Sequence, residues 1–196
     1  GGHTSSLYHE GIQPLSAALE TDYVVIGAGV AGLRAAIELA PAGRVLVIAK
    51  DALKESNSEY AQGGIACALG EDDDVSLHEA DTLTAGDGLC DQAAVHTLVG
   101  EGPQAVRELI AWGTRFDRVN GQLQFAREGA HSRSRVLHAQ GDSTGREIAH
   151  TLYEVAAKLP NVTFRGFSAV VDLLMDQGRV VGALAFVGGL SRVAKD

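Results

Sequence analysis

Three glycines, at positions 27, 29 and 32, have the spacing of a phosphate-binding turn. They lie in the motif Gly27-Ala28-Gly29-Val30-Ala31-Gly32, after an apolar β-branched run and before a segment with helical spacing. In such a motif the first glycine permits a tight turn, the second lets the backbone approach a pyrophosphate, and the third lets the helix pack on the strand. Free N–H groups at the helix start would hold the phosphates. The motif predicts dinucleotide binding, without choosing between NAD, NADP and FAD.

The position expected to contact the ribose is unusual. An acid about 20 residues after the motif, at the end of the second strand, commonly bonds the ribose hydroxyls. Here the sequence reads Ala49-Lys50-Asp51. Either Lys50 makes a nonstandard contact with the ribose or a phosphate, or it is an exposed lysine and Asp51 is the acid, displaced by one position.

A second motif carries a family resemblance. It reads Ser56-Asn57-Ser58-Glu59-Tyr60-Ala61-Gln62-Gly63-Gly64-Ile65-Ala66. This stretch resembles the flavin loop of the succinate dehydrogenase, fumarate reductase and aspartate oxidase superfamily, in the form typical of L-aspartate oxidases. The resemblance implies FAD as the cofactor, with contacts at Asn57, Ser58, Glu59, Tyr60, Ala61, Gln62, Gly63 and Gly64. Gly63 and Gly64 would let bare backbone approach the isoalloxazine ring and bond it.

Two positions refine the resemblance. The family also has lysine at the position of Lys50, so this departure from the general fingerprint supports the match. In the membrane-bound dicarboxylate enzymes, a histidine five residues before the loop glutamine holds the flavin covalently. That position is Asn57 here, so we expect the FAD to be non-covalent.

Later blocks extend the likeness from about Asp22 to Phe186. The matching stretches are His78-Glu79-Ala80-Asp81-Thr82, Ala85-Gly86-Asp87-Gly88-Leu89-Cys90-Asp91, Arg127-Glu128-Gly129-Ala130-His131-Ser132, Leu137-His138-Ala139 and Asp142-Ser143-Thr144-Gly145-Arg146-Glu147. The resemblance also places Ala169 and Val170 on the strand whose backbone contacts the adenine. From the sequence alone these two are ordinary strand residues.

Glu128 is the candidate catalytic residue. The resemblance implies that it faces the amino group of L-aspartate, since an α-ammonium needs a carboxylate and a site for succinate or fumarate does not. Without the family, Glu128 reads as a loop glutamate paired with Arg127 or Arg133. Ala130 stands where the family has glycine, and it would strain the loop if that position needs a positive φ. His131 is interpreted as structural, and so is His138.

The elements that position these residues follow from local patterns. Apolar runs at 23–26 and 45–48 predict parallel strands, and the segment 29–40 predicts the helix between them, broken by residues 41–43. Further helices are expected at 75–85, at 91–99 and from Pro103 to Gly113, where the proline suits a first turn. The acidic turn 72–74 and the basic segment 115–138 are expected to be solvated loops, the latter with ion pairs.

The last third predicts one more helix and three strands. Thr144 and Glu147 fit a capping box that opens a helix ending at Pro160. Residues 162–164 read as a strand, and 169–174 with 180–186 read as a β-hairpin around the turn 176–178. Gly188-Gly189-Leu190-Ser191-Arg192 resembles the family's glycine turn that returns to the FAD, which would mean that a strand is missing after Phe186.

Composition excludes several classes of function. A formal net charge of −9 argues against nucleic-acid binding, which needs clustered Lys and Arg. No apolar run is long enough to span a membrane, and the start does not read as a signal peptide. Cys67 and Cys90 have no metal-binding spacing, so they read as reduced, partly buried thiols of a cytoplasmic protein, and no metal is expected.

Together these observations predict an α/β fold: a Rossmann-like FAD-binding domain with a parallel sheet, flanking helices and a β-hairpin. Residues 1–20 are expected to be an N-terminal extension, and 21–196 an incomplete FAD-binding domain that lacks the family's capping and C-terminal helical domains. The resemblance implies oxidation of L-aspartate to iminoaspartate with oxygen or fumarate as acceptor, for quinolinate and NAD synthesis through quinolinate synthase. The chain alone is expected to be inactive. The alternatives are a fumarate reductase-like enzyme, a non-catalytic FAD-binding module and an NAD-binding domain.

Overall fold

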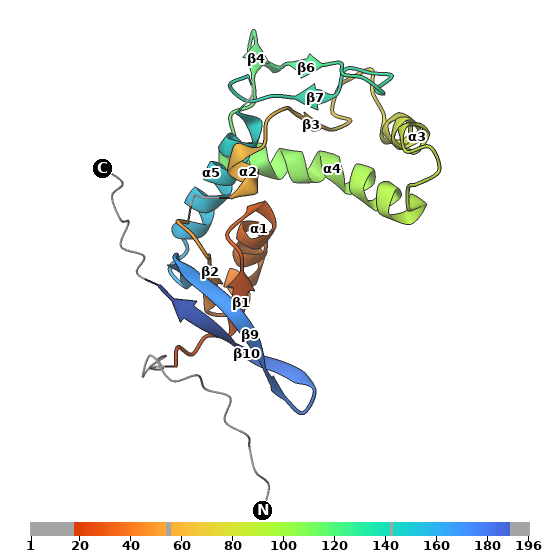
Figure 1. The fold of residues 1–196 in the computed structure, drawn as a ribbon. Coiled ribbons are helices and arrows are strands. Elements are labelled where there is room, and N and C mark those ends of the chain that lie inside the picture. Colours follow the sequence, from red (N-terminus) through yellow and green to blue (C-terminus); the bar gives the residue numbers. More distant parts are fainter. Residues whose placement is uncertain (1–17, 54–55, 142, 189–196) are drawn as a thin grey trace, which may run out of the picture.

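A computed structural model describes residues 18–53, 56–141 and 143–188 of the chain. Most of the expected N-terminal extension lies outside these ranges, and so do residues 189–192 of the expected second glycine turn. Figure 1 shows the fold of the described residues.

A parallel sheet in the order β1-β2-β8 is built from β1 (Tyr23–Ile26), β2 (Val45–Ile48) and β8 (Val162–Arg165). Helix α1 (Val30–Leu39) and a short 3₁₀ turn, η1 (Ala40–Ala42), connect the first two strands. All four residues of β2 are buried, as expected for the central strand of a parallel sheet. The predicted strand–helix–strand unit and the α/β class are therefore confirmed (Figure 1).

The predicted hairpin is also present and is longer than expected. Strand β9 (Ser168–Asp176) pairs antiparallel with β10 (Arg179–Val187). The two loop residues, Gln177 and Gly178, have φ values of 47° and 79°, the conformation that matches the twist of a two-residue hairpin. Ser168 N donates to Ala49 O, so the hairpin begins beside the end of β2.

The segment 115–138 was expected to be a solvated loop with ion pairs. It forms four short strands instead. β4 (Arg118–Val119) pairs with β5 (Gln122–Leu123). β6 (Phe125–Ala126) and β7 (Val136–Leu137) join β3 (Ile65–Ala66) in a second sheet of order β3-β7-β6. The end of the flavin loop is thus one strand of this sheet, at the top of Figure 1.

Four helices complete the described chain: α2 (Asn57–Tyr60), α3 (Val75–Ala85), α4 (Gln92–Trp112) and α5 (Thr144–Ala157). Helix α3 has its predicted bounds. The prediction of two helices between 91 and 113 was wrong, because a single helix continues through Pro103. Asp91 caps its start through Ala94 N, and Gly113 ends it in the left-handed conformation.

The predicted capping box at α5 was also wrong. Ser143 is the N-cap and makes no side-chain cap hydrogen bond. Thr144 Oγ1 accepts a hydrogen bond from Ala139 N, and Glu147 Oε1 accepts one from Arg115 N. Both side chains therefore bind backbone amides that flank the short strands, since Arg115 precedes β4 and Ala139 follows β7.

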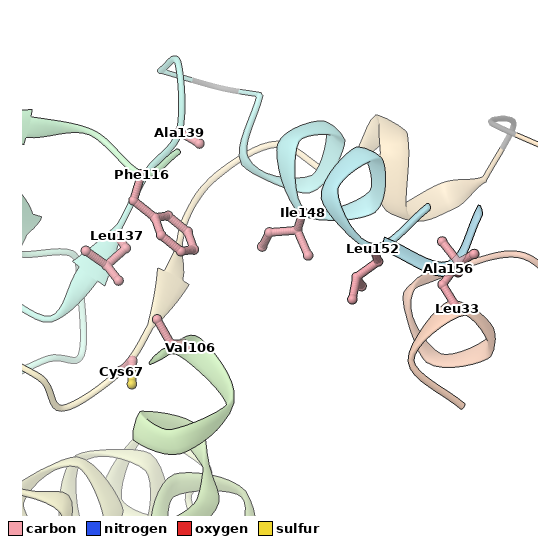
Figure 2. Packing of buried hydrophobic residues seen from close by; sticks show 9 residues of the cluster. All are labelled: Leu33, Cys67, Val106, Phe116, Leu137, Ala139, Ile148, Leu152 and Ala156. Atoms are coloured by element: carbon pink, nitrogen blue, oxygen red, sulfur yellow. The ribbon is translucent and has the colours of Figure 1, made fainter. Parts of the chain in front are cut away.

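Two apolar clusters hold these parts together. One lies around the parallel sheet and contains Val25, Ala28, Ala36, Ala40, Val45, Val47, Ala49 and Val162. The other connects α1, α4 and α5 to the second sheet and contains Leu33, Cys67, Val106, Phe116, Leu137, Ala139, Ile148, Leu152 and Ala156 (Figure 2). Burial raises the pKa of the Cys67 thiol to about 11, which makes this thiol unreactive at neutral pH.

Candidate functional site

The glycine turn between β1 and α1 has the geometry that the motif requires. Gly27 has a φ of 108°, so a side chain there would be strained. A Cβ added at Gly32 would lie 1.9 Å from Gly27 O, so this glycine is needed for the helix to pack on the turn. Gly27 and Gly32 are therefore needed by the protein's own backbone, as the motif predicts for its first and third glycines.

Gly29 is different, because its own surroundings would tolerate a side chain. It is the N-cap of α1 with φ −77° and ψ −178°, which any residue can adopt. Among the described residues, the atom nearest to an added Cβ is Ser58 Oγ, at an ordinary contact distance of 3.6 Å. The space in front of Gly29 is therefore available to a ligand, and it lies at a helix N-terminus, which favours anions.

The flavin loop is attached to this turn. Ser56 Oγ caps α2 by accepting a hydrogen bond from Glu59 N, at 3.2 Å. Ser58 Oγ in turn accepts one from Val30 N, at 3.4 Å, in the first turn of α1. A hydroxyl of the predicted flavin loop thus lies at the helix end predicted to hold the pyrophosphate.

A glycine that sequence reasoning had not singled out fixes the other side of the loop. A Cβ at Gly145, in the first turn of α5, would lie 2.2 Å from Ser58 O. Gly145 N donates to Ala61 O at 3.2 Å. Only a residue without a side chain allows α5 to approach α2 this closely. The family block that contains Gly145 was the available signal, but its pattern does not say which loop it meets.

A cavity of about 190 Å³ opens between the turn, the flavin loop and α5. Its lining residues are Ala28, Leu33, Leu53, Ser56, Glu59, Arg146, Ala149, His150 and Tyr153. Arg146 Nε lies 3.9 Å from Glu59 Oε1 across it. The α5 residues were not among the predicted contacts, since their contribution depends on the packing of α5 against α2.

The two glycines of the flavin loop have different surroundings. Gly63 has a φ of 89°, and no atom of the described residues lies within 4 Å of an added Cβ. At Gly64 an added Cβ would lie 2.2 Å from Val136 Cγ1 and 2.9 Å from His138 Nε2. Gly63 keeps the open space that a flavin ring would need, whereas Gly64 is glycine because β7 packs on it.

The remaining predicted cofactor residues lie at the carboxyl end of β2. Lys50 is exposed, and so is Asp51, whose Oδ1 accepts a hydrogen bond from Ala52 N. Phe167 N donates to Asp51 O at 3.0 Å, which brings Ala169 and Val170, at the start of β9, to the same edge of the sheet. Both interpretations of the ribose contact therefore stay open.

Glu128 lies beyond β6 and pairs with a residue that had not been expected. Its Oε1 is 3.1 Å from His138 Nε2. The expected partners bind elsewhere, since Arg127 Nε donates to His131 O and Arg133 Nε donates to Asp72 O. Ala130 does have a positive φ, 68°, so the anticipated strain is present.

A buried ion pair supports this loop. Arg135 has no exposed surface, and its guanidinium donates to both oxygens of Asp73, each at 2.8 Å, and to Asp81 Oδ2 at 2.6 Å. The expectation that the acidic turn 72–74 is merely solvated was therefore wrong for Asp73, whose side chain is fully buried. His131 Nδ1 lies 3.2 Å from Arg135 Nη1, in keeping with a structural role for this histidine.

The two carboxyl groups of this network have depressed pKa values. Hydrogen bonds from the backbone N–H and hydroxyl of Ser132, and then from Arg135, lower the pKa of Asp81. At Asp73 burial favours the neutral form, but hydrogen bonds from Arg135 and the Asp74 amide outweigh it and lower the pKa. Burial also lowers the pKa of His78, whose ring packs edge-on against His131. The acids are therefore ionised partners of Arg135 at neutral pH.

The turn, the attached loop and the parallel sheet define an FAD-binding domain. Residues 22–192 match the FAD binding domain family, and the chain belongs to it. The chain is also 43% identical over 187 residues to the L-aspartate oxidase of Mesorhizobium japonicum and 48% identical over 175 residues to that of Streptomyces coelicolor. These matches cover 95% and 88% of this chain but only 35% and 30% of the relatives, so the chain spans about a third of their length.

Solved structures agree with this assignment. The Escherichia coli quinol fumarate reductase FrdA is 33% identical, with a TM-score of 0.79 over 84% of this chain and 29% of that chain. A 3-ketosteroid dehydrogenase from Rhodococcus jostii is 23% identical, with a TM-score of 0.69 over 85% of this chain and 42% of that one, and shares the fold. In the described part of the chain no helix is long and apolar enough to cross a membrane. The same residues contain no group of three or more His, Cys, Asp or Glu side chains that could hold a metal ion.

Proposed function

We propose that the chain is the FAD-binding part of an L-aspartate oxidase, which converts L-aspartate to iminoaspartate with oxygen or fumarate as acceptor. The observation that carries this proposal is the bond from Val30 N to Ser58 Oγ, which joins the dinucleotide turn to the flavin loop. The names of the relatives support the substrate. The product would enter quinolinate and NAD synthesis, with quinolinate synthase as the next enzyme. A cytoplasmic location fits the free thiols, and cell fractionation would test it.

The chain's residues fit non-covalent FAD. The α1 start and Gly29 would hold the pyrophosphate, the end of β2 and the start of β9 the ribose and adenine, and the loop around Gly63 the ring. Asn57 provides no nucleophile for a covalent link. When bound, the flavin would supply the oxidising chemistry by accepting two electrons, while the protein positions the reactants.

Glu128 would recognise the substrate. Its carboxylate is about half exposed and can accept a charge-assisted hydrogen bond from an α-ammonium. A dicarboxylate without an amino group would leave this carboxylate unmatched, so the residue would favour L-aspartate over succinate.

Gly29→Ala provides the test of the cofactor site. The backbone and neighbours of Gly29 accept a methyl group, so the variant should fold. If the pyrophosphate lies against Gly29, the methyl group should weaken FAD binding by at least about tenfold, or about 1.4 kcal/mol. Binding is measured by flavin fluorescence quenching and by retained visible absorption after desalting.

Gly100→Ala is the matched control. Gly100 lies in α4, and no atom of the described residues is within 4 Å of an added Cβ. This variant should bind FAD as the unchanged chain does. Equal FAD affinity in a folded Gly29→Ala variant would show that the pyrophosphate does not lie at this turn, and a chain that takes up no FAD would contradict the proposed cofactor.

The fumarate reductase-like alternative has one specific observation in its favour, the structural similarity to the Escherichia coli FrdA chain. The two enzymes are separated by measuring turnover of L-aspartate and of succinate in a protein that carries this chain together with the remaining length of its relatives. If the protein oxidises L-aspartate in preference to succinate, and Glu128→Gln removes this preference, the result supports the oxidase. Oxidation of succinate alone supports the alternative.

By itself the 196-residue chain is proposed to bind FAD without turnover, because it spans about a third of the length of the relatives. The FAD-loaded chain is mixed with L-aspartate, and hydrogen peroxide and ammonia are followed over time. Sustained production of both would refute the proposal that the chain is only a binding module.

A further inference from the structure

The pair Glu128–His138 lies where the flavin loop meets the second sheet. His138 Nε2 is 3.1 Å from Glu128 Oε1 and 2.9 Å from the position of a Cβ at Gly64. Gly64 is the last glycine of the predicted flavin loop. His138 Nε2 therefore pairs with the carboxylate expected to hold the substrate and borders the loop expected to hold the flavin ring.

His138 cannot easily lie elsewhere, because β7 fixes it. It follows Leu137, which pairs with Ile65 on one side and Phe125 on the other. Its carbonyl accepts a hydrogen bond from Asp117 N at 2.8 Å. The ring is about three-quarters covered, and it borders a cavity of about 170 Å³ with Asp117, Gln124, Ala126 and Gly141.

The turn that carries Glu128 is fixed independently. His131 N donates to Glu128 O, and Arg127 Nε donates to His131 O, which closes residues 127–131 into a compact turn. Ser132 then binds Asp81 through its amide and its hydroxyl. The backbone is thus held without His138, so the histidine has only the side chain of Glu128 left to orient.

We infer that His138 is a positioning residue for Glu128. His138 donates its Nε2–H to Glu128 Oε1, and Glu128 Oε2 is left to accept a hydrogen bond from the α-ammonium of an amino-acid substrate. A glutamate side chain has three rotatable bonds, and a turn on the surface would let it sample several of them. The hydrogen bond from the His138 ring, which lies directly after β7, selects the rotamer in which Oε1 faces this ring. This inference rests on the proposed function.

The hydrogen bond also selects the imidazole tautomer. A carboxylate only accepts hydrogen bonds, so the neutral ring must carry its proton on Nε2. The first test is long-range ¹H–¹⁵N NMR of the ring in the FAD-loaded chain at pH about 8.5, where a free imidazole is neutral. We expect the Nε2–H tautomer, with its signals shifted on Glu128→Gln. An Nδ1–H tautomer, or signals that ignore Glu128→Gln, would overturn the inference.

The second test is kinetic, in a protein that carries this chain and the remaining length of its relatives. His138→Leu should raise the KM for L-aspartate at least tenfold while the FAD content stays constant. In His138→Gln the KM should stay close to that of the unchanged protein, because the glutamine amide can donate a hydrogen bond from nearly the same place. In a Glu128→Gln background His138→Leu should have no further effect on KM.

These outcomes separate the two proposals. If His138→Leu raises the KM equally in the unchanged protein and in the Glu128→Gln background, His138 has a general packing role and the positioning role is refuted. If the unchanged protein binds FAD but does not oxidise L-aspartate, the proposed function fails, and the NMR result still decides whether His138 orients Glu128.

Discussion

At the scale of single residues, Arg135 determines the stability of the loop that carries Glu128. Its guanidinium is fully buried against Asp73 and also bonds Asp81. Arg135→Met removes the charge and leaves the buried Asp73 carboxylate without its partner. Breaking a buried pair in this way should lower the free energy of unfolding by about 3 kcal/mol. Urea unfolding of the two proteins at pH 7 measures the difference. Arg133→Met, at an exposed arginine, should change it by less than about 0.5 kcal/mol.

The same network predicts how stability depends on pH. The pKa values of Asp73 and Asp81 are lowered in the fold, so their contribution is fully present above the unfolded pKa of about 4 and is lost as the pH falls through the folded values. The stability gap between the unchanged chain and Arg135→Met should therefore narrow below pH about 4. A gap that stays constant from pH 7 to pH 3 would show that the ion pair does not cause it.

Ala130 gives a prediction of the opposite sign. Its φ of 68° is unfavourable for a residue with a Cβ. Ala130→Gly should raise the free energy of unfolding by about 0.5–1 kcal/mol, since relief of strain exceeds the added flexibility of the unfolded chain. Ala80→Gly, in the exposed face of α3, should lower it by about 1 kcal/mol. Thermal unfolding would show the reverse order if Ala130 were not strained.

Residue roles could be predicted where they depend on local backbone. Gly27 and Gly32 are such cases, because turn geometry and helix packing act within six positions of the chain. The partners of Arg135 and Glu128 could not be predicted in this way. Asp73 lies 62 positions from Arg135, and a sequence pattern shows which charges exist but not which of them the fold brings together.

At the scale of secondary structure, Pro103 weakens the longest helix. It lies in the interior of α4, where it cannot donate a hydrogen bond to the preceding turn. Pro103→Ala restores the donor and should raise the free energy of unfolding by about 1–3 kcal/mol. Chemical denaturation followed by circular dichroism at 222 nm is the measurement. A loss of stability would mean that the rigidity of proline in the unfolded chain matters more than the missing bond.

The elements that were predicted well have patterns that repeat within a few residues. The runs 23–26 and 45–48 and the hairpin turn at Gln177 and Gly178 belong to this group. The errors come from tertiary contacts. Packing of Val99 and Val106 in the interior keeps α4 continuous across a proline, and Glu147 leaves its expected cap to bind Arg115.

At the scale of the whole molecule, the hairpin β9–β10 is a long and largely exposed element. Many of its apolar side chains, including Val171, Met175, Val181 and Phe186, are more than half exposed. A two-stranded hairpin has little stability of its own, so its amides should exchange with solvent faster than those of the buried strand β2. Hydrogen exchange followed by mass spectrometry tests this order. Equal protection of β2 and the hairpin would contradict it.

The position of β2 between β1 and β8 also has a consequence for synthesis on the ribosome. β1 and β2 are made before β8, so the second edge of β2 stays unpaired until Val162 is available to pair with Val45. At roughly 5–20 residues per second, on the order of ten seconds pass between the two. Throughout that time the apolar strand β2 has one unpaired edge. Chaperone binding to β2 is expected mainly within this interval.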